Sequence, residues 1–440
     1  MTEDIKLLYV DLFCGAGGTS TGVELAALDE RKCAKVVACV DHDANAIRSH
    51  KANHPNTLHF TEDIRTLEIS PMVKHLDKKR RQYPKAKVVL WASLECTNFS
   101  NAKGEQPRDA DSRTLANHLF RYIEVLKPDY IQIENVEEFM SWGDMDENGF
   151  PISKDKGTSY VRWVNNICEH GYHFDWRILN AADFGAYTSR KRFFGQFARH
   201  GLPIGFPVAT HAKNGSDSTL FTGVYEKWKP VREVLDLEDD GESIFGRKKS
   251  LIEKTLERIY AGLIKFIAGG KEAFIVKWNS VNGKTGKYVP PSIDEPAPTI
   301  TTADRFGLVT NSFLDMQYGN GTPASIDEPA PAVTVKPKHN LISVKPLIMN
   351  SNYGNIGSST EVYETDSPAT IQIKEFMALY GIADIRMRML RIPELKRIMG
   401  FPEDYTLVGT QAEQKKFIGN AVEVTIARVL CEELCKILTN

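Results

Sequence analysis

Two reactive side chains follow two apolar segments of this 440-residue chain. Cys96 comes shortly after the apolar segment 87–92, and Glu134 comes directly after the segment 130–133. A thiolate is a strong nucleophile, and a nearby carboxyl group can donate a proton as negative charge develops. The two groups together fit the addition of a thiolate to an electron-poor ring such as a pyrimidine. The alternative is a structural role for Cys96, because free cysteines are among the most buried residues.

A glycine-rich turn follows the first apolar segment of the chain. Residues 11–19 read DLFCGAGGT and lie between an expected strand at 7–10 and an expected helix at 21–28. Glycines allow the backbone to approach a ligand closely at a helix N-terminus. No Lys-Ser or Lys-Thr pair follows, so this turn is not the phosphate-binding loop of nucleoside triphosphatases. The turn predicts a small-ligand site, with a purely structural turn as the alternative.

Three further side chains extend this ligand site. Asp41 follows the expected strand 36–40, where a carboxylate can accept hydrogen bonds from a ribose diol. His42 offers a flat face to an adenine, and Asp63 can hold the edge of that base. Together with the glycine-rich turn, these residues predict a site for an adenosyl ligand.

The first half of the chain alternates between short apolar runs and segments with helical periodicity. Continuous apolar strands that alternate with helices indicate an α/β fold with a doubly wound, mostly parallel sheet. The expected strands lie at 7–10, 36–40, 87–92, 130–133, 172–180 and 191–197, and the expected helices at 21–28, 44–52, 113–126 and 160–170.

The composition changes near residue 205, where Pro, Thr, Asn and Gly become frequent. A repeat follows: SIDEPAPTI at 292–300 returns as SIDEPAPAV at 325–333 and more weakly as ETDSPATI at 364–371. Three copies are few for a stacked array. We therefore expect a first domain at 1–205, a smaller loop-rich domain with short strands at 206–375, and C-terminal helices at 376–440 that complete the first domain. Those helices are expected at 393–400, 411–417 and 421–438.

The overall composition is that of an ordinary soluble protein, with 42% hydrophobic and 25% charged residues. The net charge of −2 means that any nucleic-acid surface must be a local patch. We expect a cytoplasmic protein without a membrane span, because the sequence has neither a signal-peptide pattern nor a long apolar run. The seven cysteines form no CxxC pair, which predicts free thiols and no metal site. Cys431 and Cys435 are expected on the core face of a helix.

Seven segments of the chain resemble the DNA (cytosine-5) methyltransferase family and occur in the order found in that family. The resemblance covers residues 6–200 and 385–435, and the region between them is the one that carries target recognition in the family. The matching segments are Asp11 to Gly18, the Cys96 loop ending at Ser100, Asp111 to Arg113, Glu134 to Val136, Ala182 to Gly185 with Arg190 to Arg192, Arg388 to Pro402, and Ile418 to Val422.

The resemblance implies a fold, a reaction and partners. The implied fold is a Rossmann-like methyltransferase domain with a smaller target-recognition domain. The implied reaction transfers a methyl group from S-adenosylmethionine to C5 of a cytosine flipped out of double-stranded DNA, and leaves S-adenosylhomocysteine. A covalent bond between Cys96 and C6 of the base is the implied intermediate. The resemblance further implies a bacterial or phage enzyme that acts as a monomer and pairs with a restriction nuclease.

The same resemblance assigns roles to individual residues. The implied catalytic residues are Cys96, Glu134, Arg190 and Arg192. The implied cofactor-binding residues are Phe13, Gly15, Ala16, Gly17, Gly18, Asp41, His42, Asp63, Ile64, Leu115, Asn420 and Val422. The implied contacts to the base and the DNA are Glu95, Thr97, Ser100, Asn135, Val136, Arg113, Thr188, Lys336 and Lys338.

The chain departs from the family around the substrate base. The family has Pro before the nucleophile and Gln after it, where this chain has Glu95 and Thr97. It also has Gln where this chain has Thr188. We expect Glu95 and Thr188 to alter base selection, loop position or the transferred group, with neutral drift as the alternative. An RNA substrate and a catalytically silent DNA-binding homologue are the other interpretations that remain open.

Overall fold

The computed structural model describes residues 3–94, 115–143, 152, 156–215, 224–268, 275–277, 306–308, 312–317, 321–346, 360–380 and 382–439. The chain forms two compact units. Unit 1 comprises Met1–Lys229, Pro331–Pro337 and Leu395–Asn440, and unit 2 comprises Pro230–Ala330 and Lys338–Glu394. The short segment 331–337 therefore belongs to unit 1, although it lies inside the region that the sequence analysis assigned to the second domain.

Unit 1 is built on a mixed sheet that has eight strands within the described residues. Its path runs β2-β3-β1-β5-β6-β8-β7, and β4 pairs with the outer side of β3. Pairing is parallel among β4, β3, β1, β5 and β6, whereas β8 runs antiparallel to both β6 and β7. The strands are β1 (Glu3–Leu12), β2 (Ala27–Leu28), β3 (Arg31–Asp41), β4 (Leu58–Thr61), β5 (Lys87–Ser93), β6 (Tyr130–Asn135), β7 (Tyr172–Asn180) and β8 (Lys191–Arg199).

The strand order changes direction beside β1. From β1 the chain continues to β3 and β4 on one side and then crosses to β5 and β6 on the other. In doubly wound sheets such a switch point opens a crevice at the carboxyl ends of the strands, where ligands bind. This topology confirms the expected α/β class and predicts where the site lies.

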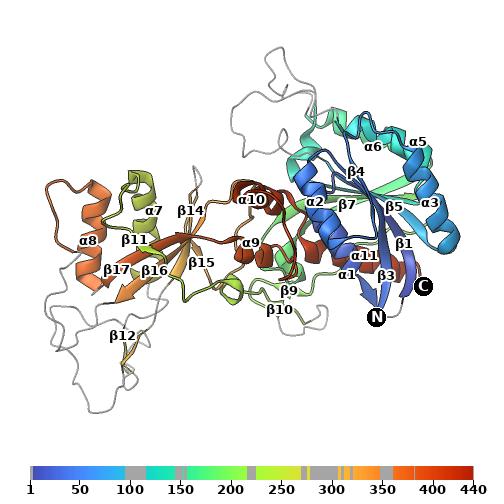
Figure 1. Cartoon of the computed structure of the whole chain (residues 1–440). Helices are drawn as coiled ribbons and strands as arrows, with labels where there is room; N and C mark the ends of the chain where they lie inside the picture. The colour runs from blue at the N-terminus through green and yellow to red at the C-terminus, as the bar shows by residue number, and fades with distance from the viewer. Residues whose placement is uncertain are drawn as a thin grey trace. The chain divides into compact units, whose positions relative to one another are not determined.

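Helices cover both faces of the sheet (Figure 1). One core contains Leu8, Val10 and Leu90 with apolar side chains of α3 (Ser70–Gln82), α5 (Leu119–Leu126) and α6 (Thr158–Cys168). The opposite core contains Tyr9 and Trp91 with side chains of α1 (Gly18–Leu25) and α11 (Val424–Ile437). Alternate residues of β1 and β5 thus point to opposite sides, and both sides are buried.

The glycine-rich turn packs against the last helix of the chain. A Cβ on Gly18 would lie 2.4 Å from the carbonyl oxygen of Val422, and one on Gly22 would lie 2.6 Å from both the Ala427 Cβ and the Val424 oxygen. These contacts leave no room for a side chain on this face of α1. The N-terminal and C-terminal parts of unit 1 are therefore in direct backbone contact beside the turn.

Within its described residues, unit 2 contains a five-stranded antiparallel sheet in the order β11-β17-β16-β14-β15, with two helices packed on it. Its core joins Ile342 and Val344 of β16 to Ile259 of α7 and Ile373 of α8. Short strands confirm one part of the expectation for this region. The elements are β11 (Glu242–Ser243), α7 (Glu253–Leu263), β14 (Ser312–Met316), β15 (Ala324–Ser325), β16 (His339–Pro346), α8 (Pro368–Tyr380) and β17 (Ile382–Met389).

Several expectations about individual elements were wrong. The helix expected at 21–28 ends at Leu25, and Ala27–Leu28 forms β2 instead. Residues 382–389 form β17 rather than part of the C-terminal helices. The two described copies of the repeat differ in structure, since 325–333 begins at the end of β15 and continues as a turn, whereas 364–371 runs into α8. Within the described residues, no helix is long and apolar enough to cross a membrane.

Candidate active site

A cavity of about 470 Å³ lies at the carboxyl edge of the parallel strands in unit 1. Its size is in the range of ordinary cofactor sites. The segments that follow β1, β3, β4 and β5 all contribute to its lining, as does the end of β6. Nine of the twelve expected cofactor residues line it: Phe13, Gly15, Asp41, His42, Asp63, Ile64, Leu115, Asn420 and Val422.

Asp41 holds the backbone at the centre of this cavity. Its Oδ2 accepts a hydrogen bond from Gly15 N at 2.9 Å, and its Oδ1 accepts one from Asp43 N at 2.9 Å. Gly15 has a φ of 52°, and Phe13 has a φ of 58°, which is uncommon for a residue with a side chain. The carboxylate at the end of β3 thus fixes a strained turn at the end of β1. Each oxygen retains a lone pair that can accept from a ribose hydroxyl.

Ala16, Gly17 and Gly18 do not line the cavity among its described walls. A Cβ on Gly17 would lie 2.4 Å from Tyr405 Oη, and Gly17 has a φ of 105°. The hydroxyl of Tyr405 donates to the carbonyl oxygen of Ala16 at 2.5 Å. These residues therefore shape the turn from behind by close packing. The sequence pattern could not separate a glycine that faces a ligand from one that faces another helix.

His42 and Asp63, the two residues expected beside the adenine, differ in their exposure and in their interactions. His42 is exposed, with 77% of its side chain accessible, so its ring face is available. Asp63 forms a bidentate pair with Arg65, with Nη2 to Oδ2 at 2.6 Å. Hydrogen bonds from Arg65 lower the pKa of Asp63 to about 2. Arg65 itself lines the cavity and was not anticipated.

Glu134, which lines the cavity at the end of β6, forms an ion pair with Arg192. Glu134 Oε1 lies 3.3 Å from Arg192 Nε, and the Glu134 side chain is buried. Burial raises the pKa of Glu134, and the guanidinium groups of Arg192 and then Arg190 oppose this rise without cancelling it. Arg190 is also buried, and its Nη1 donates to the carbonyl oxygen of Val333 at 3.1 Å. The structure thus brings three of the four expected catalytic residues together.

The end of β6 is tied to the end of β5. Asn135 Nδ2 donates to Leu94 O at 3.4 Å, and Asn135 Oδ1 accepts from Val136 N at 2.8 Å. Leu94 is the last described residue before the segment that contains Cys96. Cys96, Glu95, Thr97, Ser100 and Arg113 lie outside the described residues.

The remaining expected DNA-contacting residues fall into two groups. Thr188 is fully buried, and its Oγ1 has no hydrogen-bond partner among the described residues. Lys336 and Lys338 are exposed and belong to units 1 and 2, respectively. An exposed lysine can reach a phosphate from the surface, whereas a buried threonine contacts a base only if the base enters the site.

Glu423 is a buried carboxyl group that the sequence analysis did not single out. It caps α11, where its Oε2 accepts from Ile426 N at 2.8 Å. It lines a small gap together with Glu134, Arg190 and Arg192. Burial raises its pKa to about 7. Only the position directly after Val422 in sequence pointed to it, and that signal is weak without the structure.

Comparison with known families identifies the class of protein. The family model described as C-5 cytosine-specific DNA methylase matches residues 7–436 of the chain. The chain therefore belongs to this family and is a DNA (cytosine-5-)-methyltransferase.

Curated relatives are similar along the whole chain or along part of it. The chain is 20% identical to the type II methyltransferase M1.HphI of Haemophilus parahaemolyticus, with 99% of this chain and 88% of the relative covered. It is 21% identical to M.SacI of Streptomyces achromogenes, with coverage of 98% and 93%. The match to M.XorII of Xanthomonas oryzae pv. oryzae is 28% identical and covers 44% of this chain and 41% of that protein.

Solved structures support the fold. The chain resembles Spodoptera frugiperda DNMT2 with a TM-score of 0.52 and 15% identity, covering 99% of this chain and 100% of the other. It resembles the S. pombe Dnmt2 methyltransferase with a TM-score of 0.50 and 17% identity, at the same coverage. These similarities confirm the expected Rossmann-like methyltransferase fold.

Proposed function

We propose that the chain methylates C5 of a flipped-out cytosine in a specific double-stranded DNA sequence through a covalent bond from Cys96 to C6. The observation that carries this proposal is the pairing of the buried Glu134 with the half-buried Arg192, together with the fact that Glu134 lines the same cavity as Asp41 and the glycine-rich turn. A proton donor for the cytosine ring thus lines the same cavity as the proposed site for an adenosyl group.

The chemistry assigns one step to each residue. The Cys96 thiolate forms a bond to C6, and the protonated Glu134 carboxyl gives its proton to N3, so C5 becomes enamine-like. Burial raises the pKa of Glu134 and so favours the protonated carboxyl that this step requires. After methyl transfer, the C5 proton leaves to solvent, the Sγ–C6 bond breaks, and N3 returns its proton to Glu134. The Arg190 and Arg192 guanidinium groups stabilise charge on the base and its phosphate.

The cavity residues fit S-adenosylmethionine, which supplies an electrophilic methyl group. Asp41 would accept from the ribose hydroxyls, and Phe13 and Ile64 would flank the adenine. Acidic lining residues such as Asp41 and Glu62 also suit a ligand with a positive sulfonium and ammonium group. Asn420 and Val422, next to α11, would close the site from the other side.

Unit 2 is proposed as the target-recognition domain. Flipping the base out of the helix costs a few kcal/mol of unstacking, and contacts to phosphates and base edges must offset that cost. Lys336 and Lys338 are exposed and are our candidates for phosphate contacts. A neighbouring restriction nuclease in the same cell would explain why such a sequence-specific enzyme exists.

Trapping on a fluorinated substrate tests the proposal. Duplex DNA with 5-fluorocytosine at the target position should form an SDS-stable adduct with the full-length protein only when S-adenosylmethionine is present, because the C5–F bond does not break. The adduct should be absent in Cys96→Ser and strongly reduced in Glu134→Gln. Cys168→Ser, which changes a cysteine on α6, is the matched control and should trap like the parent.

The outcomes separate the alternatives. An adduct with RNA and not with DNA would indicate an RNA substrate. DNA binding without any adduct in the parent protein would indicate a catalytically silent homologue and would overturn the proposal. Glu95→Pro should change the rate or product if Glu95 tunes the site, and an unchanged product would remove that expectation. Sequencing of methylated cytosines in cells that express the chain would give the recognition sequence.

A further inference from the structure

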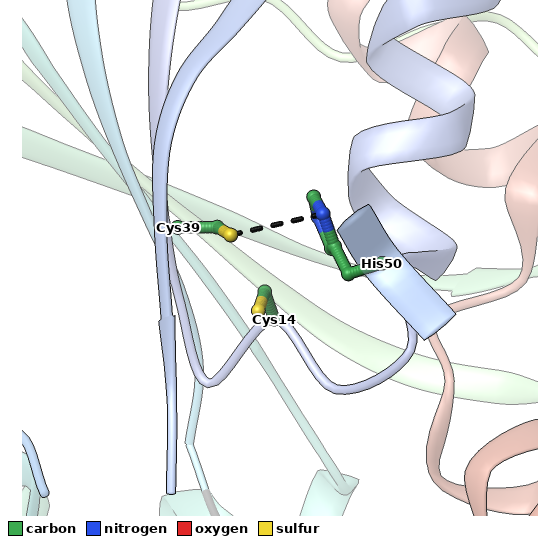
Figure 2. Close-up of side chains that lie close together, drawn as sticks. All are labelled: Cys14, Cys39 and His50. Atoms are coloured by element: carbon green, nitrogen blue, oxygen red, sulfur yellow. Dashed lines mark hydrogen bonds between the residues drawn. The ribbon is translucent and has the colours of Figure 1, made fainter. Parts of the chain in front are cut away.

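Two cysteines and a histidine come together behind the glycine-rich turn of unit 1. Cys14 lies in the turn after β1, Cys39 lies on β3, and His50 lies on α2 (Ala44–Asn53). All three side chains are buried, and their ligand atoms lie within 4.8 Å of one another. Figure 2 shows Cys39 and His50 pointing toward each other, with Cys14 beside them on the turn. Three different elements thus converge on one point.

Hydrogen bonds behind His50 favour the tautomer that carries its proton on Nε2. Ser20 Oγ donates to Asp11 Oδ2 at 2.7 Å, so its oxygen accepts from His50 Nε2 at 2.9 Å. The ring then carries its proton on Nε2 and a lone pair on Nδ1. A histidine that binds a metal commonly donates its other ring N–H in this way, which orients the ring. His50 Nδ1 is the nitrogen that faces the two thiols.

The distances agree with a tetrahedral metal site. Metal–sulfur bonds of about 2.3 Å and metal–nitrogen bonds of about 2.0 Å place neighbouring ligand atoms roughly 3.3–3.8 Å apart in a tetrahedron. Cys39 Sγ lies 3.7 Å from His50 Nδ1. His59 Nε2, from β4, lies 3.0 Å from the same nitrogen, which is slightly closer than that range. The Cys39–His50 distance therefore suits two ligands of one ion, and a bound ion would replace the contact between His59 and His50 Nδ1.

We propose that Cys14, Cys39 and His50 bind one thiophilic metal ion, zinc(II) by preference. A mixed set of thiolates and imidazoles selects zinc over hard cations. On binding, each thiol loses its proton to solvent and forms a sulfur–metal bond. The spacing of these residues in sequence does not follow the usual short pairs, so the site is visible only in the fold.

The position of Cys14 gives the ion a consequence for the cofactor cavity. Cys14 lines that cavity and lies between Phe13 and Gly15, two residues with positive φ. An ion bound to Cys14 would hold the turn to α2 as well as to β3. Removal of the ion should loosen the turn and weaken S-adenosylmethionine binding, whereas the catalytic assignment of Glu134 is independent of it.

Metal content of the full-length protein tests the proposal directly. The chain should be expressed without a histidine tag, purified without chelator, and analysed by inductively coupled plasma mass spectrometry. We expect about one zinc ion per chain, and a loss of at least tenfold in Cys39→Ser and His50→Gln. Cobalt(II) added to metal-free parent protein should give a thiolate charge-transfer band that both variants lack. Cys168→Ser should retain the ion and the band.

Other results would overturn the proposal without bearing on the methyl-transfer mechanism. Parent protein that contains no metal and gives no cobalt band rules the site out, and this measurement needs no variant to fold. Loss of the ion in Cys33→Ser but not in Cys39→Ser would place it at the buried cluster of Cys33, Cys431 and Cys435. Mass spectrometry of the non-reduced protein could also give a mass that is lower than calculated by two hydrogens. If this difference maps to Cys14 and Cys39, the two cysteines form a disulfide instead of a metal site.

Discussion

Arg192 Nε lies 3.3 Å from Glu134 Oε1, and the pair joins the end of β6 to the start of β8. The two strands are antiparallel neighbours, so their backbones hold the two side chains in place. Burial favours the neutral carboxyl, whereas the guanidinium favours the charged one, and burial has the larger effect on the pKa of Glu134. The ion pair therefore tunes a proposed proton donor rather than simply stabilising the fold.

Arg192→Met should shift the pH dependence of methyl transfer. Because Arg192 lowers the pKa of Glu134, its removal should raise that pKa further and move the alkaline limb of the single-turnover rate to higher pH. The maximal rate should also fall, by roughly tenfold or more, because a charge-stabilising group is lost. Arg199→Met, on the same strand, is the control. An alkaline limb that stays in place or moves to lower pH would contradict the assignment.

Asp41→Asn should weaken cofactor binding. The amide keeps one oxygen acceptor, so either Gly15 N or Asp43 N faces an NH₂ group and loses its partner. We expect the dissociation constant for S-adenosylhomocysteine to rise by roughly 10–100-fold, measured by isothermal titration calorimetry. Binding of DNA without cofactor should be unchanged. Equal affinity in Asp41→Asn and the parent would mean that this carboxylate does not organise the site.

Gly22→Ala should destabilise unit 1. Its Cβ would lie 2.6 Å from the Val424 carbonyl oxygen, and backbone atoms of α11 cannot move aside as a flexible side chain can. We expect a loss of about 1–3 kcal/mol, seen as a lower melting temperature. Gly205→Ala is the matched control, because the three atoms nearest to its Cβ belong to the side chains of Ile437 and Glu433. Similar melting temperatures for the two variants would refute this view of the α1–α11 contact.

Glu423→Gln should remove a pH dependence of stability. The folded pKa of Glu423 is raised to about 7 from an ordinary 4.5, so the folded state holds the proton more tightly than the unfolded state. The stability that the protonated Glu423 contributes is therefore lost as pH rises, by about 2–3 kcal/mol between pH 5 and pH 8. The variant should gain stability over the parent at pH 8 and gain little at pH 5. The check is chemical denaturation of both proteins from pH 5 to pH 8. A stability difference between variant and parent that stays constant over this pH range would contradict the raised pKa of Glu423.

Most strands of unit 1 could be predicted from the sequence, because short continuous apolar runs that alternate with helical segments are typical of a parallel sheet. The strand at 172–180 was placed as the structure has it, and residues around Gly15, Asp41 and Asn420 were assigned to a site that they do line. Roles for these residues stay predictions until they are tested. The resemblance to a family supplied the assignments that spacing alone could not.

Other features required the fold. The partner of Gly17 is Tyr405, which lies far away in sequence, so no local pattern shows that this glycine faces a side chain rather than a ligand. Arg65 enters the cavity through a turn after β4, a strand that the apolar pattern missed. Cys39 and His50 look like unrelated core residues until β3 and α2 are placed side by side.

The contact of Gly18 and Gly22 with residues 422–427 also bears on how the protein is made. The turn that begins the cofactor site leaves the ribosome first, but the helix that backs it is synthesised roughly 400 residues later. During that interval the apolar face of β1 that α11 will cover must remain exposed or be held by a chaperone. A chain that stops before residue 422 should therefore bind no cofactor, so an incomplete copy cannot modify DNA.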